Sequence, residues 1–223
     1  MKQHHVKIKS IQHLTHDVLK IVTGKPLNYD FTPGQATEIS INKEGWKNEK
    51  RPFTFTCLPD QTFLEFSIKI YASHKGVTNE LLKLKENDEL ILHDVFGAIA
   101  YKGEGLFIAG GAGITPFISI LRDLHSKNKI GNNKLIYANK TEGDIILAEE
   151  FKSLLGKNFI NILSEKKADG YSYGQITEGF LKDYVKGPKE NIYVCGPPPM
   201  MEAIETFLSN LHVDKKMIIK EVF

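Results

Sequence analysis

The stretch LFIAGGAGITPF, residues 106–117, has the clearest structural pattern in this chain. It opens with the all-apolar run Leu106 to Ala109, which is typical of a strand buried on both faces. A glycine-rich turn follows. Apolar residues then recur at helical spacing, at Phe117, Ile120, Leu121 and Leu124. The stretch therefore predicts a buried strand, a tight turn and a helix, which together begin a βαβ unit.

The same alternation continues downstream. Short apolar strands are expected at residues 135–138, 159–163, 192–195 and 217–222, and helices at residues 147–155, 177–184 and 200–211. Strands that alternate with helices predict a doubly wound parallel sheet, here with five strands.

The first hundred residues follow another pattern. Leu64, Phe66, Ile68 and Ile70 alternate with polar residues, which predicts a strand with one buried face. Further strands are expected at residues 6–8, 36–41, 53–56 and 89–93, and only residues 77–84 look helical. Many short strands predict an antiparallel barrel or sandwich, and the change in pattern places a domain boundary near Lys102-Gly103.

Composition excludes several classes of function. The 223 residues carry a net charge of +2 with no long basic block, so nucleic-acid binding is not expected. Cys57 and Cys195 are too few to hold a 2Fe–2S cluster, and the eight His form no metal set. Residues 1–10 lack the apolar core of a signal peptide, and no stretch is suited to span a bilayer. A cytoplasmic protein with reduced thiols, no membrane contact and no resident metal is expected.

Two glycine-rich turns follow predicted strands of the second half. In the first, residues 110–116, free N–H groups at the helix start can bind phosphate, with Thr115 as N-cap and Pro116 in the first turn. The second is CGPPPM, residues 195–200. Ligands of doubly wound sheets bind at the carboxyl ends of the strands, where both turns are expected. Each turn alone can equally be structural.

Two motifs of the first half can also carry chemistry. In RPFTFT, residues 51–56, Arg51 can bind a phosphate and Thr54 the edge of a heterocycle, although a surface arginine on a strand is the simpler interpretation. In KGVTNELL, residues 75–82, the helix start can hold a second phosphate or be an ordinary capped helix.

Taken in order, these segments resemble the ferredoxin–NADP reductase superfamily over nearly the whole chain. RPFT at residues 51–54 is similar to its flavin motif, and FTPGQ at residues 31–35 to the turn before it. GVT at residues 76–78 is similar to its flavin-phosphate segment, and residues 110–116 and 195–198 to its nucleotide turns. The terminal EVF resembles the Glu-Val-Tyr end of plant-type members, with Phe223 in place of the Tyr.

The resemblance implies a Greek-key FAD-binding barrel over residues 1–101 and an NAD(P)-binding α/β domain over residues 102–223. It implies FAD as cofactor and NADPH or NADH as hydride donor. Catalytic roles would fall to Thr54, Cys195, Glu221 and Phe223. The implied flavin contacts are Arg51, Pro52, Phe53, Thr54, Lys69, Ile70, Tyr71, Gly76, Val77 and Thr78. The implied nucleotide contacts are Gly110, Gly111, Gly113, Thr115, Pro116, Ser164, Gly196, Pro197 and Met200.

The choice of nucleotide stays open in the sequence. Plant-type members place Arg after the Ser that corresponds to Ser164, where it would meet the 2′-phosphate of NADP, and this chain has Glu165 there. Glu165 would repel that phosphate, whereas Lys166 and Lys167 would attract it, so the balance favours NADPH only slightly.

The implied activity is electron transfer from NAD(P)H through FAD to a separate one-electron acceptor, such as an acidic flavodoxin or ferredoxin, by a monomer. The alternative enzyme is an NAD(P)H-dependent reductase of free flavin or ferric chelates. A third hypothesis is an electron-transfer or nucleotide-sensing subunit without turnover of its own.

Overall fold

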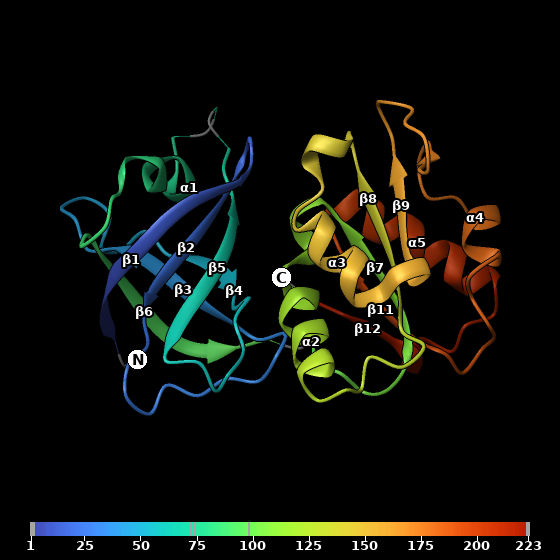
Figure 1. Cartoon of the computed structure of the whole chain (residues 1–223), viewed down its shortest axis with the longest axis horizontal. Coiled ribbons are helices and arrows are strands. Elements are labelled where there is room, and N and C mark those ends of the chain that lie inside the picture. Colours follow the sequence, from blue (N-terminus) through green and yellow to red (C-terminus); the bar gives the residue numbers. More distant parts are fainter. Residues whose placement is uncertain (1–2, 72, 74, 98, 222–223) are drawn as a thin grey trace.

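The chain folds into two halves that lie side by side, each built on one sheet (Figure 1). The computed structural model describes residues 3–71, 73, 75–97 and 99–221. Residues 222 and 223 therefore lie outside the described part, and with them the predicted role of Phe223.

The first half is an antiparallel sheet that closes on itself. Within the described residues it has six strands, in the order β4-β3-β6-β1-β2-β5. Their bounds are β1 His4–Thr15, β2 Val18–Gly24, β3 Ala36–Ile41, β4 Arg51–Thr54, β5 Phe63–Lys69 and β6 Glu89–Phe96. A bridge between Phe55 and Phe66 joins the β4 and β5 edges and closes the barrel. The chain crosses from β2 to β3, which pairs with β6, as in a Greek key.

The second half is a parallel sheet with helices on both faces. Its described strands run in the order β10-β9-β8-β7-β11-β12. Their bounds are β7 Gly105–Gly110, β8 Lys134–Asn139, β9 Phe159–Leu163, β10 Ser172–Tyr173, β11 Asn191–Cys195 and β12 Ile218–Lys220. The helices are α2 Thr115–Ser126, α3 Ala148–Leu155, α4 Glu178–Lys182 and α5 Pro198–Asn210. Strand order reverses between β7 and β11, so the glycine-rich turns that follow these two strands meet at the switch point.

The predicted fold class, a barrel followed by a doubly wound sheet, is confirmed. The prediction of five parallel strands was short by one, because the two-residue β10 is too brief to leave an apolar pattern. The predicted helix over residues 77–84 is instead α1, Val77–Glu80, followed by a 3₁₀ turn over Leu81–Lys83. Thr115 was predicted as an N-cap but is the first residue of α2, because a 3₁₀ turn over Gly111–Ile114 already leads into the helix.

Strand β5 differs from its predicted half-buried character. Its polar residues Glu65 and Ser67 are only 8% and 5% exposed, because the second half of the molecule covers the outer face of the barrel there. Helix α2 makes this contact. The N–H of Gly34 donates to Ser119 Oγ at 3.0 Å, and Arg122 bonds the barrel carbonyl of Thr56 at 2.7 Å.

The predicted boundary after Tyr101 falls in the connection between β6 and β7. Tyr193 of β11 binds this connection, because its hydroxyl donates to the carbonyl of Gly103 and accepts from the N–H of Lys102, both at 2.8 Å. The end of the connecting segment is therefore held against the parallel sheet. No helix in the described ranges is long and apolar enough to cross a membrane.

Candidate functional site

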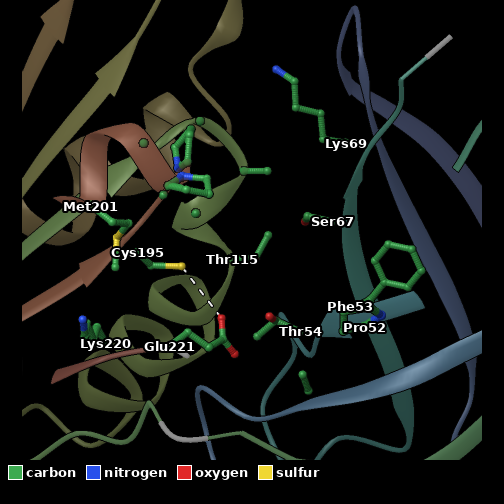
Figure 2. Close-up of a pocket in the computed structure, with 18 of the residues that line it drawn as sticks. Pro52, Phe53, Thr54, Ser67, Lys69, Thr115, Cys195, Met201, Lys220 and Glu221 are labelled. Atoms are coloured by element: carbon green, nitrogen blue, oxygen red, sulfur yellow. Dashed lines mark hydrogen bonds between the residues drawn. The ribbon is translucent and has the colours of Figure 1, made fainter. Parts of the chain in front are cut away.

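A cavity of about 680 Å³ lies between the two halves (Figure 2). The barrel contributes residues from β4 and β5, and the second half contributes the two glycine-rich turns and Glu221, which directly follows β12. Predicted site residues that line it are Pro52, Phe53, Thr54, Lys69, Tyr71, Thr78, Gly110, Gly111, Gly113, Thr115, Cys195, Gly196, Pro197 and Glu221. Segments that are far apart in sequence thus meet around one space.

The barrel wall of the cavity carries two hydroxyl groups. The bridge between Phe55 and Phe66 puts Thr54 opposite Ser67 across the closing edge, so both side chains leave the same outer face. Figure 2 shows both facing Thr115, Cys195 and Glu221 across the cavity. Thr54 is 8% and Ser67 is 5% exposed.

The opposite wall depends on glycine. A Cβ atom on Gly113 would lie 2.3 Å from the carbonyl oxygen of Cys195, and one on Gly110 would lie 2.4 Å from the sulfur of Met200. The turns after β7 and β11 therefore touch along their backbones, which only residues without a side chain permit. Residues at the start of α2 and in the 3₁₀ turn before it line the cavity, among them Gly113 and Thr115.

Cys195 and Glu221 form a pair on this wall, with the Cys195 sulfur 3.9 Å from a Glu221 carboxylate oxygen. Burial raises the pKa of the Glu221 carboxyl to about 7. Burial and the nearby carboxylate raise the pKa of the Cys195 thiol to about 12. The thiol is therefore neutral near pH 7, whereas the carboxyl changes its protonation there. Glu221 Oε1 is buried and has no hydrogen-bond partner within the described part of the chain.

Substitution of Glu221 by Gln tests this environment through stability. The carboxyl has a pKa near 4.5 when exposed and about 7 in the fold, so the folded state holds its proton more tightly. The free energy of unfolding of the wild type, relative to E221Q, should then be highest below about pH 4.5 and fall as pH rises through 7. Urea unfolding at pH 5 and pH 8 measures this. Equal differences between the two proteins at both pH values would contradict a raised pKa.

A second cavity of about 500 Å³ continues from the first and shares Lys69, Gly110, Gly111 and Pro197 with it. It runs over the ends of β8 and β9, where Asn139, Lys140 and Ser164 line it, and Met200 of α5 completes it. The two spaces together form an elongated site along the switch point of the sheet. Lys69, at their junction, binds Asp17 of the barrel at 2.8 Å.

Of the predicted site residues that the structure describes, five do not line either cavity. Ile70 and Val77 pack in the barrel core, and Pro116 is buried in α2. Gly76 precedes α1 and lies outside the cavity wall. Arg51 is exposed; its guanidinium donates to the carbonyl of Lys50 at 2.6 Å and lies 3.7 Å from Glu49.

The sequence reasoning missed several lining residues. Ser67 lies between the core residues Phe66 and Ile68 of β5, so the alternating pattern predicts a solvent-facing side chain, yet it lines the first cavity. Lys220 and Glu205, which form an ion pair, belong to a strand end and a helix face with no motif of their own. Asn139 ends β8 and Lys140 follows it, and their place at the carboxyl end of a parallel strand was the available signal.

Comparison with known proteins agrees with this geometry. The family model described as the oxidoreductase NAD-binding domain matches residues 107–206. The NADH-cytochrome b5 reductase 2 of Lodderomyces elongisporus is 30% identical over 225 residues, which cover 89% of this chain and 72% of that protein. The chain belongs to the ferredoxin–NADP reductase superfamily. This confirms the predicted family, the predicted oxidoreductase class and the predicted use of FAD with NAD(P)H.

Two further comparisons define how far the likeness extends. The NADH-cytochrome b5 reductase 2 of Mycosarcoma maydis is 32% identical over 88% of this chain. The chain spans only 62% of that relative's length. The FAD/NAD-binding domain of a nitric oxide dioxygenase from Vibrio cholerae superposes with a TM-score of 0.87 at 23% identity, covering 98% of both chains. At that identity the superposition supports the fold alone.

Proposed function

We propose that this reductase oxidises NADH, reduces a bound FAD and passes the electrons singly to a separate carrier protein. The observation that carries the proposal is the first cavity, in which the Thr54 hydroxyl of the barrel faces Cys195 and Glu221 of the second half. Hydride transfer needs two rings in contact, and this cleft has one wall for each ring.

The residues of the cleft suit FAD and a nicotinamide nucleotide. Ser67 Oγ and Glu221 Oε1 in the first cavity and Asn139 Nδ2 in the second are buried without a hydrogen-bond partner among the described residues. Buried polar atoms normally have partners, so these atoms favour polar ligands that supply them. Bound flavin supplies the redox chemistry, accepting two electrons and releasing them one at a time.

The remaining roles belong to the chain itself. Thr54 is proposed to bond the flavin edge, with Pro52, Phe53 and Tyr71 along the ring and Thr78 toward the phosphates. Gly111, Gly113 and Thr115 would bind the nucleotide backbone, and Ser164 its adenosine end. Arg51 would reach the FAD phosphates by turning from its exposed contact with Glu49. Glu221, with its pKa near 7, would hold a proton beside the nicotinamide.

NADH is proposed as the donor, which reverses the slight preference for NADPH drawn from sequence. Lys140 lines the second cavity, but its ammonium lies 2.8 Å from the Glu165 carboxylate. Lys167 lies over the Tyr173 ring at 5.1 Å. The charges of Lys140 and Glu165 offset each other, so this ion pair suits the uncharged ribose hydroxyl of NADH better than the 2′-phosphate of NADPH. Both cytochrome b5 reductase relatives are also named for NADH.

Substitution of Glu165 by Gln should therefore raise kcat/KM for NADPH about tenfold, because it frees Lys140 and removes a repulsive charge. The value for NADH should stay within about twofold. The matched control is Glu149→Gln on α3, which makes the same change of charge at an exposed residue outside both cavities. Equal NADPH constants in wild type and E165Q would contradict this assignment.

The proposed function is tested by flavin content and by the choice of acceptor. The protein is incubated with FAD, freed of unbound flavin and assayed with NADH and either cytochrome c, as a one-electron protein acceptor, or free FMN. One FAD per chain and reduction of cytochrome c that depends on it are expected. A protein that holds no flavin yet reduces free FMN with NADH would support the flavin-reductase alternative instead.

A further inference from the structure

The outer face of the barrel carries successive cross-strand pairs along its closing edge. Thr56 accompanies Glu65, since the N–H of Thr56 donates to the carbonyl of Glu65 at 2.8 Å. One step further along the same face, the register places Thr54 opposite Ser67. All four side chains point toward the second half of the molecule, because residues two apart on a strand share a face.

These two pairs differ in how they are satisfied. Glu65 accepts a hydrogen bond from the Thr56 hydroxyl at 2.9 Å and one from Arg122 of α2 at 2.6 Å. Ser67 Oγ is buried and has no partner within the ranges the structure describes. A buried hydroxyl that stays unbonded costs stability, so a chain that keeps one at a cavity wall has a use for it.

We infer that Ser67 is a second hydroxyl contact, beside Thr54, for the polar edge of the bound flavin ring. This rests on the proposed function, since it takes FAD as the occupant of the first cavity. A serine hydroxyl both donates and accepts, and the flavin edge offers ring nitrogen and carbonyl acceptors as well as an N–H donor. The position of Ser67 between Thr54 and Lys69 on the same wall directs its hydroxyl to the same occupant.

The test compares FAD binding by the wild type, Ser67→Ala and Ser67→Thr. Ala removes the hydroxyl, and Thr restores it on a side chain that suits a strand. Ser40→Ala is the matched control, because Ser40 Oγ is also buried and unpartnered, on β3 of the same barrel, but lies outside both cavities. FAD affinity is measured by quenching of flavin fluorescence, and the visible flavin spectrum and the melting temperature of the FAD-free protein are recorded for each variant.

We expect S67A to weaken FAD binding about five- to tenfold and to change the visible spectrum, because one net hydrogen bond is lost. S67T should restore affinity to within about twofold of the wild type, and S40A should leave it unchanged. Without FAD, S67A should melt no lower than the wild type, since it removes an unsatisfied buried group.

Wild-type affinity and spectrum in S67A would overturn the role of Ser67 and leave the proposed function intact. A loss in S40A as large as that in S67A would also overturn it, because the effect would then belong to the barrel as a whole. A wild-type protein that binds no FAD would overturn the proposed function itself, and the inference with it.

Discussion

Replacing Arg122 with Ala is expected to lower the free energy of unfolding by about 3–5 kcal/mol. Arg122 lies on α2 and bonds both carboxylate oxygens of Glu150 on α3. Its remaining amino group reaches Glu65 and the carbonyl of Thr56 in the barrel, at 2.6 and 2.7 Å. Removal of the guanidinium leaves two carboxylates, one of them buried, without their cation, and such a loss is far costlier than that of a surface pair.

The effect should also reach the cleft. Glu65 is two residues from Ser67 on β5, so the Arg122 contact holds the wall that faces the glycine-rich turns. Urea unfolding of R122A measures the stability. Lys127→Ala is the control, because Lys127 directly follows the same helix and its ion pair with Asp123 is exposed. That control should change stability by less than about 0.5 kcal/mol. If R122A and K127A unfolded at the same urea concentration, the ion pairs of Arg122 would not contribute measurably to the free energy of unfolding.

Replacing Gly113 with Ala is expected to reduce NADH oxidation about 100-fold, since a displacement of about 1 Å at a reacting centre can have that effect. The new Cβ would lie 2.3 Å from the Cys195 carbonyl oxygen and 2.7 Å from the Gly196 Cα, so the two turns must separate. Their separation moves Cys195 and the start of α2, which line the side of the cavity proposed to hold the nucleotide.

Gly24→Ala is the control for this substitution. Gly24 ends β2, and no atom lies within 4 Å of the place its Cβ would take. Steady-state rates of NADH oxidation with a one-electron acceptor compare the two variants. A G113A protein with the rate of G24A would show that the contact between the turns does not position the reacting groups.

The sequence predicts those parts of this fold that repeat a local pattern. The all-apolar β7 and β8 and the amphipathic α2 and α5 are found within a few residues of their expected bounds, because parallel strands and their helices bury continuous apolar faces. Strand β10 escaped prediction because two residues form no period. Strand β2 was not assigned, although its VLKIVTG run is rich in β-branched residues.

The sequence predicts the site residues that belong to short motifs. It does not predict contacts between the two halves of the molecule. Thr54, Gly113 and Cys195 belong to short motifs, and the structure brings them around one cavity. Glu65 lies on strand β5 of the barrel and Arg122 on helix α2 of the other half, 57 residues further along the sequence, so no local pattern relates them. The burial of Ser67 depends on the same docking of the two halves, which is a property of the tertiary fold alone.

We propose that hydride passes directly from nicotinamide to flavin within the first cavity, where one wall would hold each ring. This transfer is tested most directly by mixing the FAD-loaded protein with NADH under anaerobic conditions, in single turnover, and following the loss of the visible flavin absorption. We predict rapid and complete bleaching, slowed severalfold when the transferred hydrogen of NADH is deuterium. Flavin that stays oxidised in the presence of excess NADH and NADPH would contradict direct hydride transfer in this cavity.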